Sequence, residues 1–217
     1  MPQYFPPNSN AFAKWSIYGG LIFVTLLVTV MVVYARTYRN RVTVVVEQPV
    51  AFQHSLHAGE LGIDCRYCHN TVEVAASANV PPTEVCMTCH SQIRVGTPQL
   101  AGVQESWDTG LPIEWNRVHD LADFVYFNHA AHINKGIGCN HCHGEVDRMS
   151  GIWKAAPMTM GWCLECHRNP EEYVRPRHEV FNLSYERPAN QLELGRRLVE
   201  EYHINTAKLP QCSTCHR

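Results

Sequence analysis

The chain has 217 residues, with 18 Lys plus Arg and 20 Asp plus Glu, so its formal net charge at pH 7 is −2. Without a strongly basic field it lacks the electrostatic signature of a nucleic-acid-binding protein, and no nucleic acid is expected among its partners. It contains 10 Cys and 13 His, while its 13 Gly and 13 Pro predict many turns and little long regular structure.

The first predicted element is a transmembrane helix over 15–35, which follows a short cytoplasmic N-terminus over 1–14. The segment from Trp15 to Ala35 has no charged residue, and about 20 apolar residues in a helix cross the hydrocarbon core of a bilayer. A cleaved signal peptide would have a shorter apolar region and a cleavage site of small residues. We therefore expect an uncleaved anchor in contact with membrane lipid.

Every cysteine belongs to a copy of the pattern Cys-x-x-Cys-His, which is typical of covalent c-type haem attachment. Two thiols three residues apart lie on one side of a helical turn and can both bond to one porphyrin, and the adjacent imidazole can bind its iron. A disulfide framework would not require one constant spacing, and zinc sites need no His directly after the second Cys. The sequence thus predicts five covalently bound c-type haems. Their attachment residues are Cys65, Cys68, Cys86, Cys89, Cys139, Cys142, Cys163, Cys166, Cys212 and Cys215, and their proximal ligands are His69, His90, His143, His167 and His216.

Covalent haem attachment takes place outside the cytoplasm, so the chain is expected to be a single-pass protein of a bacterial cytoplasmic membrane with its haem domain, 42–217, on the periplasmic side. The charges near the helix weakly favour the opposite orientation, because Arg36, Arg39 and Arg41 follow it and only Lys14 precedes it. We base the predicted orientation on the haem chemistry and not on these charges.

The haem domain contains an internal duplication. The pattern Phe-x-His-x-x-His begins at Phe52 before the first motif, and it recurs about 75 residues later at Phe127 before the third. This predicts two dihaem repeat units, 52–91 and 127–168, and a C-terminal extension for the fifth haem over 169–217.

The expected fold is mainly α with extensive loops, little sheet and a haem-dominated core, attached to the N-terminal transmembrane helix. The domain offers only about 35 residues for each haem, too few for an ordinary apolar core. The spacing of Leu194, Leu198 and Tyr202 predicts a short amphipathic helix over 188–203.

Eight histidines lie outside the motifs and could bind the second face of each iron. Both rings of a His-x-x-His pair lie on one side of a helical turn and can serve two neighbouring haems. We expect the first of each pair to serve the haem just downstream. The predicted distal ligands are therefore His54, His57, His129 and His132, with His119 as the fifth.

Other residues compete less well for the irons. His141 is constrained between two haem-bound cysteines, and His178 and His203 are expected at the surface. A methionine is the rival ligand, with Met160 preferred over Met158, because a thioether raises the potential of the iron. The alternative is that both methionines pack against porphyrin.

The duplicated pattern resembles class III multihaem cytochromes c, the cytochrome c3 and c7 group. The anchor, the five motifs, Arg117–His119 ahead of Phe124–His129, and the Met-Gly-Trp-Cys core of 158–168 are together similar to the pentahaem, membrane-anchored subunit of bacterial alternative complex III. This resemblance covers nearly the whole chain. It implies a quinol-oxidising respiratory complex with integral-membrane quinol-binding subunits, an iron–sulfur, molybdopterin-enzyme-like subunit, and a monohaem cytochrome c as acceptor.

The expected function is therefore that of a non-catalytic electron-transfer subunit, which relays single electrons through its haems to a periplasmic cytochrome c or a similar acceptor. The first alternative is a stand-alone membrane-anchored multihaem quinol dehydrogenase of the NapC/NirT type. The second is a multihaem reductase, such as a nitrite reductase, which needs one open iron and often a Lys in place of a proximal His. All five motifs here end in His.

Overall fold

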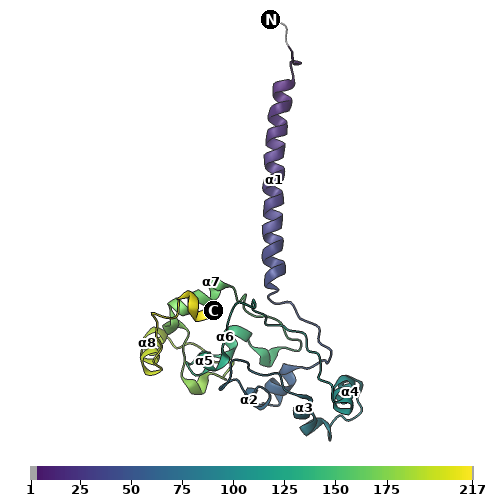
Figure 1. The fold of residues 1–217 in the computed structure, drawn as a ribbon, viewed down its shortest axis with the longest axis vertical. Helices are drawn as coiled ribbons and strands as arrows, with labels where there is room; N and C mark the ends of the chain where they lie inside the picture. The colour runs from purple at the N-terminus through teal and green to yellow at the C-terminus, as the bar shows by residue number, and fades with distance from the viewer. Residues whose placement is uncertain (1–3, 217) are drawn as a thin grey trace. The chain divides into compact units, whose positions relative to one another are not determined.

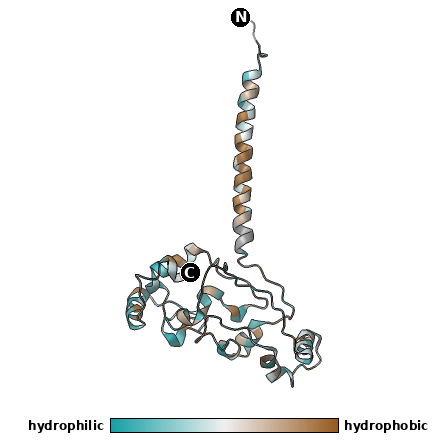
Figure 2. Ribbon diagram, in the orientation of Figure 1, coloured by the Kyte–Doolittle hydropathy of each residue, from teal (hydrophilic) through white to brown (hydrophobic). Residues whose placement is uncertain are grey.

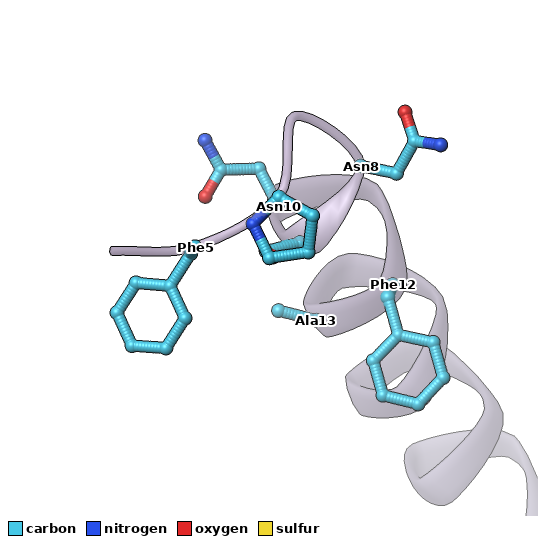
Figure 3. A pocket seen from close by; sticks show the side chains of 7 residues that line it. Phe5, Asn8, Asn10, Phe12 and Ala13 are labelled. Carbon is cyan, nitrogen blue, oxygen red and sulfur yellow. The ribbon is translucent and has the colours of Figure 1, made fainter. Parts of the chain in front are cut away.

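The computed structural model describes residues 4–216, and the chain divides after Arg41 into two units (Figure 1). The first unit contains one long helix, α1 (Ser9–Asn40). Its part from Ser9 to Ala35 is long and apolar enough to cross a membrane, and the apolar residues run along its middle (Figure 2). A shallow hollow at its beginning is lined by residues such as Phe5 and Phe12 and contains neither Cys nor His (Figure 3).

The second unit begins at Val42 and consists of short helices joined by loops. The described residues form no β-strand, and their β-pairing is limited to isolated bridges, such as that between Ile137 and Val174. This confirms the predicted mainly helical fold with little sheet. The α-helices are α2 (Cys65–Cys68), α3 (Thr83–His90), α4 (Ala101–Thr109), α5 (His129–Ile133), α6 (Cys139–His143), α7 (Met160–Arg168), α8 (Gln191–Glu201) and α9 (Cys212–Cys215). The remaining elements are a π-helix, η1 (Ser55–Glu60), and the 3₁₀ helices η2 (Pro98–Leu100), η3 (Val146–Arg148), η4 (Pro170–Glu172) and η5 (Arg177–Glu179).

The two copies of Phe-x-His-x-x-His fold differently in one respect. In the second copy the side chain of Asn128 caps α5 by accepting a hydrogen bond from the Ala131 amide at 3.1 Å. The first copy has one more residue between its second His and the next Cys. This extra residue is accommodated in the π-helix η1, where the Leu61 amide donates to the Leu56 carbonyl at 2.9 Å. A π-turn takes up a single inserted residue, so the helical pairing of the histidines is preserved.

The interior of the second unit consists of separate small apolar clusters. One joins α3 to α4, one joins α5 to the segment around Val180, and one joins α8 to Val174. Small clusters agree with a fold in which porphyrin rings supply much of the buried apolar surface. The residues at their centres are Val50, Met87 and Val103; Val72, Ile133 and Val180; and Val174, Leu198 and Tyr202.

Helix α8 approaches η4 so closely that Gly195 has no room for a side chain. A Cβ atom there would overlap the carbonyl group of Glu171. We predict that Gly195→Ala lowers the free energy of unfolding by about 1–3 kcal/mol, because the strain exceeds the gain in helix propensity. Denaturation of the haem-loaded chain, followed by far-UV circular dichroism, measures this. Leu192→Ala, at a half-exposed position of the same helix, is the control and should cost much less. Equal stabilities would contradict the close approach.

Candidate haem sites

Each Cys-x-x-Cys-His motif lies on a helical turn. The first, third and fifth motifs form α2, α6 and α9, the second ends α3, and the fourth lies within α7. Residues three apart in a helix lie on the same face, so the two thiols of a motif lie side by side. None of the ten cysteines forms a disulfide.

Three of the five motif histidines face a histidine of a His-x-x-His pair. An imidazole nitrogen lies about 2 Å from the metal it binds, so two imidazoles on opposite sides of one ion have ring centroids about 6 Å apart. The structure gives this separation three times, and the residues present therefore fit an iron held between two imidazoles. The pairs are His57 with His90 at 6.2 Å, His129 with His143 at 6.3 Å, and His132 with His167 at 6.2 Å.

Backbone carbonyls set the tautomer of most of these rings. A carbonyl oxygen only accepts hydrogen bonds, so the Nδ1 atom of each bonded ring must carry the proton, and Nε2 keeps the lone pair that binds a metal. Four motif histidines are held in this way: His69 by Asn79 at 2.6 Å, His90 by Ile93 at 3.3 Å, His167 by Leu209 at 3.1 Å and His216 by Phe124 at 3.1 Å. So are three of the paired histidines: His57 by Gln53 at 2.9 Å, His129 by Ala76 at 2.9 Å and His132 by Asn128 at 2.8 Å.

Burial keeps several rings neutral, which is the form that binds metal. Loss of solvent lowers the pKa of His143 to about 3, and that of His54 to about 4. The next contribution to the lowered pKa of His54 is the charge of His69, the histidine of the first motif. Burial also lowers the pKa of His132. These imidazoles are therefore deprotonated at neutral pH in the polypeptide without haem.

A phenylalanine packs on both rings of each His-x-x-His pair. Phe52 meets His54 edge-on at 4.8 Å and stacks on His57 at 4.4 Å. Phe127 repeats the arrangement with His129 at 4.8 Å and His132 at 4.4 Å. In the sequence these phenylalanines stand out only as part of the repeat, and the signal that indicates their packing role is their fixed place before the first His.

His119 lies beside the third motif. Its ring lies 4.2 Å from that of His143 at an angle of 63°, which is too close for an iron between the two rings. Burial lowers the pKa of His119 to about 4, and its Nε2 atom is buried without a hydrogen-bond partner. His216 packs against Phe124, with ring centroids 5.8 Å apart.

The remaining histidines and the rival methionine occupy other surroundings. His141 stacks on Trp162 at 5.1 Å, and His178 is exposed beside Glu179. Met160 begins α7 and is 64% exposed, so its side chain is not packed within the polypeptide.

Interactions between thiols show which motifs are neighbours. Burial is the main reason that the pKa of the Cys139 thiol is raised to about 11 and that of Cys142 to about 12. In four thiols the second cause is the charge of a cysteine in another motif. Cys86 acts on Cys68, Cys65 on Cys139, Cys166 on Cys142, and Cys215 on Cys163.

Comparison with known proteins identifies the family. Residues 31–109 match the class III cytochrome c family, and residues 125–217 match cytochrome c7 and related cytochrome c. Cytochromes of these families carry covalently bound c-type haem. The chain is also 31% identical over 172 residues to the multiheme cytochrome c subunit of menaquinone reductase from Nitratidesulfovibrio vulgaris, an alignment that covers 78% of this chain and 68% of the relative. The chain therefore belongs to the multihaem cytochromes c of the class III and cytochrome c7 type.

Proposed function

We propose that this cytochrome is the membrane-anchored electron-transfer subunit of a quinone-linked respiratory complex and that it carries five c-type haems. The observation that carries the proposal is the set of facing imidazoles, with ring centroids 6.2–6.3 Å apart, around three of the five motifs. An iron bound by two imidazoles has no open position for a substrate and exchanges single electrons. The chain itself supplies attachment, orientation of the axial rings and exclusion of water.

The contacts support one assignment of distal ligands. His57 serves the second motif, His129 the third and His132 the fourth, according to the ring separations. We assign His54 to the first motif, because the charge of His69 contributes most, after burial, to the lowered pKa of His54.

For the fifth motif we favour Met160 over His119. Met160 lies one helical turn before Cys163 in α7, on the same face of the helix. The thiol of Cys163 interacts with Cys215 of the fifth motif. Near-infrared magnetic circular dichroism should then show four bis-imidazole haems and one imidazole–thioether haem. Five bis-imidazole signals would exclude Met160 in favour of a histidine.

The proposed location follows from the anchor and from the attachment chemistry. The apolar part of α1 is long enough to cross a bilayer, and covalent attachment of haem takes place outside the cytoplasm. We accordingly propose residues 1–14 on the cytoplasmic side, 15–35 in the membrane and 42–217 in the periplasm, with the two dihaem units and the fifth-haem extension as delimited above.

The proposed partners are the other subunits of the complex. Integral-membrane subunits would bind the quinone, an iron–sulfur, molybdopterin-like subunit would adjoin the cytochrome, and a monohaem cytochrome c would exchange electrons with it. The resemblance to alternative complex III implies that electrons come from quinol. The name of the relative, a menaquinone reductase subunit, implies the opposite direction for that protein. A chain of low-spin haems serves either direction, and the potentials of the partners determine which one is used.

Purification from membranes in mild detergent tests the proposal. We expect five equivalents of haem per chain by the pyridine haemochrome assay, together with co-purifying integral-membrane and iron–sulfur subunits. Clearly fewer than five equivalents would contradict the assignment of the motifs. A lone chain whose haems are reduced by added quinol would instead favour the NapC/NirT type, and binding of nitrite to the reduced protein would favour a reductase.

A further inference from the structure

The loop of residues 70–79, which follows the first motif, holds histidines from both repeats. The carbonyl of Asn79 accepts a hydrogen bond from Nδ1 of His69 at 2.6 Å, and the carbonyl of Ala76 accepts one from Nδ1 of His129 at 2.9 Å. Residues three apart in one loop therefore orient the proximal ring of the first motif and the distal ring assigned to the third.

Further contacts join the same two parts of the chain. The His129 and Ala130 amides donate to the carbonyls of Ala76 and Ala75 at 3.0 and 3.1 Å, and Asn134 Nδ2 donates to the carbonyl of Glu73 at 2.9 Å. Val72 in this loop is buried with Ile133 and Val180, and Cys139 of the third motif packs against that cluster. The first motif thus adjoins the third directly.

The second motif lies on the other side of the first. The hydroxyl of Tyr67, inside the first motif, lies 2.8 Å from that of Thr88, inside the second. Met87, the residue next to Thr88 in α3, packs against Val103 of α4. Helix α4 contains no attachment motif.

The third, fourth and fifth motifs continue in the opposite direction. His141, inside the third motif, stacks on Trp162, which directly precedes the fourth. His167 of the fourth motif donates to the carbonyl of Leu209, three residues before the fifth. Figure 1 shows α3, α2, α6 and α7 following one another across the second unit.

We infer that loop 70–79 is the junction between the repeats and that it arranges the five attachment motifs in space in the order second, first, third, fourth, fifth. This inference rests on the proposed function, because it matters only if all five motifs carry haem. The exposure of the cysteines agrees with it. Cys89 and Cys212 are the exposed cysteines of the ten, and they belong to the two motifs placed at the ends. The order of the motifs in space therefore differs from their order in the sequence. In the sequence the first motif stands at one end of the series, whereas in space it lies between the second and the third.

Two matched variants of the full-length chain, His54→Met and His57→Met, test the order by electron paramagnetic resonance. A thioether ligand raises the potential of its iron, so the altered haem of each variant is reduced together with the fifth haem, to which Met160 is assigned, when dithionite supplies two electrons per chain. The unmodified chain with one electron, in which only the fifth haem is reduced, is the reference for both variants. Reduction makes the altered iron diamagnetic and removes its dipolar broadening of neighbouring signals. We expect His54→Met to change the signals of two other haems and His57→Met to change the signal of one.

The opposite result, one changed signal for His54→Met and two for His57→Met, would overturn the inferred order. Five haems per chain with that opposite result would leave the proposed function intact. Fewer than five haems in the unmodified chain would count against the proposed function itself.

A second comparison uses removal of one haem. In a His129→Met background, which labels the third haem, Cys65→Ala with Cys68→Ala should shift the midpoint potential of the label. Cys86→Ala with Cys89→Ala should leave that potential nearly unchanged. A shift only upon removal of the second motif would overturn the order. If the doubly substituted chains do not fold, the resonance experiment on the intact set of haems decides alone.

Discussion

Replacing His132 by methionine should raise the midpoint potential of one haem by on the order of 0.1–0.2 V, because a thioether stabilises ferrous iron relative to an imidazole. His132 faces His167 at 6.2 Å, and its Nδ1 atom is bonded to the Asn128 carbonyl at 2.8 Å. Under the proposed assignment, the substitution exchanges one ligand of a single iron. A spectroelectrochemical titration of the full-length protein measures the shift.

His178→Met is the matched control for this substitution. The side chain of His178 is 79% exposed, and its Nε2 atom lies 3.6 Å from the Glu179 carboxylate, so all haem potentials should remain as they are in the unmodified protein. An unchanged titration for His132→Met would show that His132 does not bind iron.

Replacing Phe127 by alanine should lower the free energy of unfolding by about 2–3 kcal/mol, because it removes a half-buried ring that packs on two imidazoles. Its contacts with His129 and His132 match those of Phe52 with His54 and His57. Phe52→Ala should therefore have a similar effect. Chemical denaturation monitored by the Soret band measures both values.

The same two substitutions should also disturb the orientation of the axial rings, which a purely structural residue would not do. The resonance spectrum of Phe127→Ala is expected to change for the two haems of the second repeat and not for those of the first. Phe127→Leu retains most of the volume and should recover most of the stability. Equal spectra for the alanine variant and the unmodified chain would show that the ring plays no part in orienting the histidines.

Several features of the fold could be predicted because they depend on local patterns. The predicted helix over 188–203 contains α8, since its leucines recur at helical spacing and Leu198 is 4% exposed. The uncharged run after Lys14 lies within α1. A mainly helical fold followed from motifs that require helical turns, and the apolar clusters are small, as expected of a short chain that must surround large cofactors.

Other features depend on contacts between residues distant in sequence, and no local pattern indicates them. The carbonyls of Ala76, Asn79 and Leu209 orient haem-site histidines, but a carbonyl is present at every residue and has no sequence signal. For the same reason the pairing of the first motif with the third could not be predicted. The π-helix was detectable only as the one-residue difference between the repeats.

The paired histidines on single helical turns have a consequence for the speed of electron transfer. His129 and His132 lie in one turn of α5, so the separation of their backbone positions is set by the rise of the helix, about 1.5 Å per residue. Under the proposed assignment this turn would hold the irons of the third and fourth motifs at a nearly fixed distance from each other. Thermal motion of the surrounding loops would leave that separation nearly constant. Electron transfer within a repeat would therefore depend little on motions of the surrounding loops, whereas transfer between the repeats would depend on the rigidity of loop 70–79.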